Sequence, residues 1–130
     1  MKTLVAISLL VMLCLLDLGC ATHRMYEGEA RPKDQVAVIK HPTGPSGVQV
    51  TIENVDGLAH TGGYGDTDVL PGRHRVALKV LRGKMMAAQS VSFDARAGHV
   101  YRIEAAESLL CSVFDDANGT NVTLPQERAP

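Results

Sequence analysis

The sequence predicts an all-β fold, a sandwich or barrel of about seven short antiparallel strands behind an N-terminal signal peptide. Three observations lead to this fold class. Apolar and polar residues alternate with a period of two in several short segments, as in strands with one buried face. Turn signals rich in Gly, Pro, Asn and Asp separate these segments at roughly 8–12-residue spacing. After the N-terminal segment, no stretch sustains a helical period.

Length and composition narrow the function classes. A chain of 130 residues allows one domain, too small for a two-domain enzyme. The net charge of −1 gives no electrostatic footprint for nucleic acid, and we expect no nucleic-acid partner. Aromatic residues make up only 4% of the chain and Trp is absent, which weakens any case for stacking of bases or sugars.

The first residues have the pattern of a signal peptide. Lys2 is a short positively charged region, and Leu4–Leu16 is a run of thirteen residues that is apolar except for Ser8. A membrane-spanning helix needs about 20 apolar residues, so this run has the length of a signal-peptide core instead. We therefore expect residues 1–19 to be a signal peptide that is removed from the mature protein.

The segment Leu18-Gly19-Cys20 resembles the lipobox of bacterial lipoproteins, although Asp17 stands where that family usually has Leu. The resemblance implies cleavage after Gly19 and a diacylglyceryl group on the Cys20 thiol. Ala21 follows the cysteine in place of Asp, which by the enterobacterial sorting rule implies the outer membrane. The alternative is ordinary signal-peptidase cleavage after Ala21, because Gly19-Cys20-Ala21 also has the small-x-small pattern.

The first half of the remaining chain predicts a tether and two strands. Residues 20–35 are polar and end at Arg31-Pro32, which favours an extended backbone, so we expect a flexible tether. A domain then spans residues 36–124. Its first strands are expected at Val36–Ile39, which is wholly apolar, and at 48–53, where Val and Ile alternate with polar residues. A Pro- and Gly-rich loop at 41–47 separates them, and Asp56-Gly57 is a turn.

The second half continues with strands and turns. The Gly-rich segment Leu58–Thr67 is expected to be a flexible loop, and Pro71-Gly72 favours a type II turn with Gly72 at positive φ. Alternation predicts strands at 74–81, 89–93, 100–104, 112–114 and 122–124, with 85–89 ambiguous. The turns between them are expected at 82–84, at 94–98, and at Asn118-Gly119, a strong hairpin signal. Ala105–Leu110 allows one short helical turn, and residues 125–130 are expected to be a disordered tail.

A family resemblance runs through these segments. Val36-Ala37-Val38-Ile39, Ile52 to Gly57, Ala97-Gly98-x-x-Tyr101 and Asp115 to Gly119, in this order, resemble a group of small bacterial lipoproteins of unknown function. Leu70-Pro71-Gly72-x-His74-x-Val76 is also similar to the PEGA-type β-sandwich module of surface proteins. The resemblance implies an Ig-like or transthyretin-like sandwich, and it implies no catalytic residue.

The three cysteines leave one thiol in the mature chain. Cys14 lies in the signal-peptide core, and Cys20 either carries lipid or is removed with the signal peptide. Cys111 then has no partner for an intramolecular disulfide. Because it lies in the apolar run Leu109–Phe114, we expect it to be buried and unreactive.

The titratable residues form no motif for catalysis or metal binding. None of the histidines pair at i, i+2 or i, i+4 spacing, so we interpret them as exposed loop residues, at positions His23, His41, His60, His74 and His99. Acidic residues and an Asn near two turns are interpreted as turn-forming, at Asp66, Asp68, Asp115, Asp116 and Asn118. The Gly62–Gly65 segment lacks phosphate-loop spacing, and no serine lies in a Gly-x-Ser-x-Gly elbow. We therefore expect no catalytic residue, no metal and no cofactor.

Two functional hypotheses remain. The first is a non-enzymatic envelope lipoprotein, bound to the membrane through lipid on Cys20 and facing the periplasm. Its β-sandwich would then contact another envelope protein or sit in an envelope assembly. The second is a soluble periplasmic or secreted ligand-binding module that uses the Leu58–Asp68 loop. Metabolic labelling with a fatty acid separates the two hypotheses.

Overall fold

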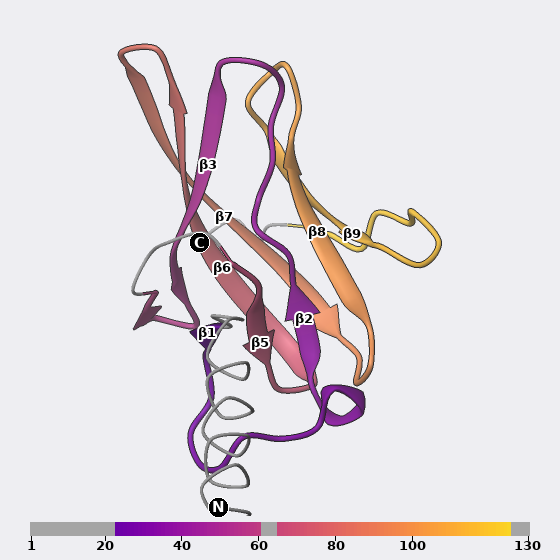
Figure 1. Ribbon diagram of the computed structural model, residues 1–130. Helices are drawn as coiled ribbons and strands as arrows, with labels where there is room; N and C mark the ends of the chain where they lie inside the picture. Colours follow the sequence, from indigo (N-terminus) through magenta and orange to yellow (C-terminus); the bar gives the residue numbers. More distant parts are fainter. Residues whose placement is uncertain (1–22, 61–64, 126–130) are drawn as a thin grey trace, which may run out of the picture.

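The computed structural model describes residues 23–60 and 65–125. Within these ranges the chain forms two β-sheets (Figure 1) around one hydrophobic core, which confirms the all-β prediction. The first sheet has the order β1-β5-β2-β8-β9, formed by His23–Arg24, Thr67–Val69, Ala37–Ile39, Val100–Ala105 and Cys111–Asp115. The second has the order β4-β3-β6-β7, formed by Leu58–Ala59, Val48–Val55, Gly72–Arg82 and Met85–Ala95. The first sheet is mixed, since β1 pairs with β5 and β2 with β8 in parallel, and the second sheet is antiparallel throughout.

The period-two alternation places one set of side chains in the core. Every second residue of β6 is buried from Val76 to Val80, and β3 and β8 alternate in the same way. Phe93 on β7 and Tyr101 on β8 meet across the two sheets, with ring centroids 4.9 Å apart and planes inclined by 55°. The buried Tyr101 hydroxyl accepts a hydrogen bond of 2.9 Å from the backbone N–H of Arg96, so its polar atom is satisfied.

Strands β6 and β7 form the longest hairpin of the fold, with eleven residues in each strand. The turn between them is at Gly83-Lys84, as expected, and Gly83 has φ +58°. The ambiguous segment 85–89 is part of β7, because each of its residues pairs with β6 in an unbroken register from Arg82↔Met85 onward. In Figure 1 this hairpin extends to one end of the molecule.

The expected tether contains ordered structure from His23 onward. β1 pairs in parallel with β5, and a 3-10 helix, η2, spans Lys33–Gln35. Lys33 forms an ion pair with Asp68, at 2.8 Å and across 35 positions of sequence. β1 and η2 were not expected from the sequence, because polar residues can pair with a sheet edge that the local sequence does not reveal. Residues 1–22, which include the predicted signal peptide, and 126–130 lie outside the described residues.

The expected loop at 58–67 contributes strands at both of its ends. β4 pairs with the end of β3 across the Asp56-Gly57 turn, where Asp56 has φ +53° and Gly57 φ +84°. β5 is buried at all three positions and pairs with β1 and β2. Pro71 is a bend without a hydrogen-bonded turn, and Gly72 begins β6 with φ +130°. Gly72 therefore has the predicted positive φ but not the predicted type II turn.

Two other expectations near the C-terminus are corrected. Residues 106–109 form a hydrogen-bonded turn without a helix, closed by the Leu109 N–H on the Ala106 carbonyl at 2.8 Å. The Asn118-Gly119 turn is present, but 122–124 is not a strand. This segment crosses between the two sheets instead, because Val122 N–H binds the Val113 carbonyl of β9 and Leu124 N–H binds the Ser92 carbonyl of β7.

Candidate functional site

The predicted anchor residues, Gly19 and Cys20, lie outside the described residues, but the structure shows how the chain continues after them. His23 N–H donates to the Asp66 carbonyl at 2.8 Å, and Met25 N–H donates to the Asp68 carbonyl at 2.9 Å. These bonds hold β1 on the edge of the first sheet. The three residue steps from Cys20 to His23 span at most about 11 Å. A membrane anchor at Cys20 would therefore keep the domain close to the bilayer.

The histidines nearest to this anchor lie close together. The rings of His23 and His60 have centroids 4.4 Å apart, and His60 Nε2 lies 3.0 Å from the Thr67 hydroxyl. Burial lowers the pKa of His60, and the positive charges of His23 and His41 lower it further. Within residues 23–60 and 65–125, no group of three or more His, Cys, Asp or Glu side chains is arranged to hold a metal ion.

Two further histidines, His74 and His99, each have an aspartate partner. His74 binds the Asp56 carboxylate through Nδ1 and the Leu70 carbonyl through Nε2. His99 Nδ1 lies 2.8 Å from Asp115 Oδ2. His74 thus joins β6 to the turn between β3 and β4, and His99 joins the residue before β8 to the end of β9. Both side chains hold the fold together, and the expectation of free loop residues is wrong for these two histidines.

The acidic clusters also have structural partners. Asp68 is paired with Lys33, and Asp116 is within ion-pair distance of both Lys40 and Arg102. Asp115 Oδ1 accepts the N–H of Ala117 at 3.1 Å. A side-chain oxygen that accepts the N–H of the residue two positions ahead forms an Asx turn, as the sequence predicted for this segment. The Gly62–Gly65 segment lies mostly outside the described residues.

Cys111 is 4% exposed on β9, as the sequence predicted. Its backbone N–H is held by the side-chain carbonyl of Gln89 at 3.0 Å, and the amide group of Gln89 donates to the Leu109 carbonyl. Gln89 therefore links β7 to the start of β9 as a further strand would. Burial raises the pKa of the Cys111 thiol, which disfavours the reactive thiolate.

We expect the Cys111 thiol to react with a maleimide only after denaturation. The Cys111→Ala variant should lose this denaturant-dependent labelling and about 1 kcal/mol of unfolding free energy, because it leaves a small cavity. Labelling of the native protein at the rate of a free thiol would contradict the burial of Cys111. A disulfide-linked dimer that disappears in Cys111→Ala would contradict it as well.

Two hollows open on the surface of the described domain. One has a volume of about 300 Å³ and lies between residues 41–44 and the start of β3 at 48–51, with His41 as its titratable side chain. The other, of about 600 Å³, lies beside β7 and is lined by Arg73, Arg75 and Asp56 together with Leu110, Leu124 and Pro125. The second hollow combines charged and apolar side chains, as protein-binding surfaces do.

The β6–β7 hairpin carries a surface that the sequence analysis missed. The chain has no acidic residue from His74 to Phe93, whereas Arg75, Lys79, Arg82 and Lys84 are cationic. Met85 and Met86, directly after the turn, are each 66% exposed. The absence of acidic residues over twenty positions was the sequence signal that could have found this surface.

No helix in residues 23–60 or 65–125 is long and apolar enough to cross a membrane. In comparisons with known proteins, no family model, no curated sequence and no solved structure matches the chain. The resemblance to small bacterial lipoproteins and to the PEGA-type module therefore stays a prediction from the sequence.

Proposed function

We propose that this protein is a non-enzymatic bacterial envelope lipoprotein, with Gly19 as the last residue of its signal peptide and Cys20 as its lipidated residue. The proposal includes an outer-membrane location facing the periplasm and an Ig-like or transthyretin-like arrangement of the two sheets. The lipid on Cys20 holds the domain at the membrane, and the domain contacts another envelope protein or takes part in an envelope assembly.

The observation that carries this proposal is the position of β1. Gly19-Cys20 follows the apolar run Leu4–Leu16 and lies two residues before β1, a strand that is hydrogen-bonded to the domain. Only two residues would therefore separate a lipid on Cys20 from the folded domain. Such a short link restricts how far the domain can move from the bilayer.

Two further features support a role in binding a protein partner and not in catalysis. The described histidines and aspartates hold turns and strands together through named hydrogen bonds, His74 with Asp56 and His99 with Asp115. The larger hollow places Leu110 and Leu124 beside Arg73 and Arg75, a mixture suited to a protein partner. The soluble-module hypothesis uses the segment Leu58–Asp68 as a binding loop. Both ends of this segment belong to strands, β4 and β5.

Metabolic labelling with a fatty acid tests the proposal. We expect the wild-type chain to incorporate the label and to fractionate with membranes, and Cys20→Ser to lose both properties and to accumulate as an uncut precursor. The matched control is Cys111→Ala, which changes a cysteine in the same chain and should keep the label. Label on the Cys20→Ser protein would exclude lipidation at Cys20, and an unlabelled wild-type chain that begins at Thr22 would identify the soluble alternative.

A further inference from the structure

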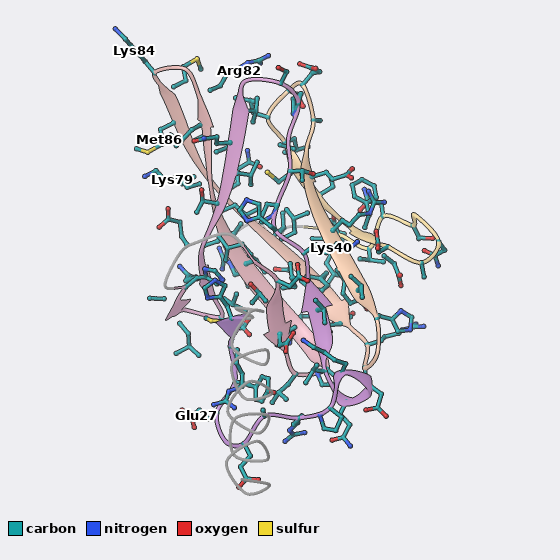
Figure 2. All side chains as sticks on the ribbon, in the orientation of Figure 1. Glu27, Lys40, Lys79, Arg82, Lys84 and Met86 are labelled. Atoms are coloured by element: carbon teal, nitrogen blue, oxygen red, sulfur yellow. The ribbon has the colours of Figure 1, made fainter. Side chains whose placement is uncertain are left out.

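The tip of the β6–β7 hairpin, residues 79–88, combines unpaired cations with exposed apolar side chains. Cross-strand register places Leu81 opposite Met86 and Arg82 opposite Met85, so the two methionines lie on opposite faces of the hairpin. Figure 2 shows Lys79 and Met86 pointing away from the sandwich and Lys84 extending from the turn. The tip is therefore a convex projection with apolar and cationic groups on its surface.

The charge at this tip is unbalanced. Arg82 forms an ion pair with Glu107, whose Oε2 lies 3.4 Å from Arg82 Nη2. Lys79 and Lys84 form no ion pair with any residue in the described ranges. Three cations thus face one carboxylate, which leaves the tip positively charged and complementary to an anionic surface.

The two methionines indicate what kind of anionic surface fits. Met85 and Met86 begin β7 at the end of the hairpin, and both side chains are exposed. A flat protein partner would need a matching pocket for each face of the hairpin. Flexible apolar side chains beside lysines suit the boundary between lipid headgroups and acyl chains, because that layer accepts both groups without a preformed shape.

We propose that the hairpin tip docks on a membrane surface rich in anionic lipid headgroups. Met85 and Met86 enter the headgroup layer, and Lys79 and Lys84 contact the lipid phosphates. The inference rests on the proposed function in one respect, since the lipid on Cys20 is what brings the domain to that membrane. The hairpin gives the domain a second contact, which fixes its orientation.

The distance between the two contacts allows both on one bilayer. His60 lies against His23, and its N–H binds the carbonyl of Glu53 on β3, beside Ala77 of β6. From Ala77 to Arg82 there are five residue steps, about 17 Å of strand. A domain that lies with its strands along the membrane plane can therefore touch the bilayer near β1 and at the hairpin tip.

Because the chain contains no Trp, a single introduced tryptophan can report on the tip by its fluorescence. A full chain with Met86→Trp carries a single fluorophore at the tip, at a site exposed enough to accept it. The matched control is Ala117→Trp, at an exposed turn after β9 on the other sheet. Both proteins are added to vesicles of pure phosphatidylcholine and to vesicles with phosphatidylglycerol, and each sample is also assayed for fatty-acid label.

We expect the fluorescence of Met86→Trp to shift to the blue and to be quenched by brominated lipid in phosphatidylglycerol vesicles only. Adding Lys79→Gln and Lys84→Gln should lower the ratio of docked to free tip about 25-fold, at roughly five-fold per lysine. Salt at about 1 M, where the Debye length is about 3 Å, should reverse the shift. Ala117→Trp should not respond.

A silent Met86→Trp spectrum in labelled, membrane-bound protein would overturn this inference and leave the lipid anchor intact. An equal response in both vesicle types, or an equal response of Ala117→Trp, would overturn it as well. A response of Met86→Trp in a chain that takes up no fatty acid would support the docking tip and contradict the lipid anchor at Cys20. The two proposals can thus fail separately.

Discussion

Phe93→Ala should lower the free energy of unfolding by about 3–5 kcal/mol, the range for removing a large aromatic side chain from a core. Phe93 is fully buried and its ring packs on Tyr101 of the opposite sheet. The substitution therefore removes a contact that joins the two sheets and leaves a cavity between them. Because small domains are stable by only about 5–15 kcal/mol, the loss should be visible as a large decrease in the urea midpoint.

The second of the two phenylalanines is the matched control. Phe114 is only partly buried, on β9, where its ring lies under the Arg102 guanidinium at 5.6 Å. Phe114→Ala should cost about 1 kcal/mol, since it removes partial burial and one exposed cation–π contact. Equal losses for the two variants would show that Phe93 is not the contact between the sheets that the structure describes.

Asp115→Ala should lower the free energy of unfolding by about 1.5–3 kcal/mol. The Asp115 carboxylate is almost fully buried, and it accepts hydrogen bonds from His99 Nδ1 and from the Ala117 N–H. Removing it leaves both donors without this acceptor and releases the turn after β9. Asp116→Ala is the control, because its partners Lys40 and Arg102 are partly exposed and such pairs contribute at most about 1 kcal/mol.

The same carboxylate predicts a pH dependence. The hydrogen bond from His99 lowers the pKa of Asp115, against the opposing effect of burial, and the Ala117 N–H lowers it further. A carboxyl group with a lowered pKa in the folded state stabilises the fold above its ordinary pKa of about 3.9. This stabilisation is lost as the pH falls through the folded-state value.

Urea unfolding at a series of pH values measures this effect. The wild-type protein should lose stability below about pH 4 more steeply than Asp115→Ala, which no longer has the group that titrates. Parallel curves for the two proteins over this range would contradict a stabilising ionised Asp115.

The sequence alone determined the longer strands and most of the turns between them. Wherever apolar and polar residues alternate over five or more positions, as at 48–53, 74–81 and 100–104, a strand is present. The turns at Gly57, Gly83, Gly98 and Gly119 all have positive φ, a conformation that glycine adopts at little cost. The burial of Cys111 was also readable, because its neighbours are apolar.

Only the tertiary structure decided how the short and polar segments pair. β5 is buried at Thr67, Asp68 and Val69, which gives no alternation to read, and its partners β1 and β2 are far away in sequence. The ion pair of Lys33 with Asp68 and the links from Gln89 to Leu109 and Cys111 likewise join distant residues. Local patterns report which side of a strand is buried, whereas pairing between distant segments depends on which edges remain open after the longer strands have packed.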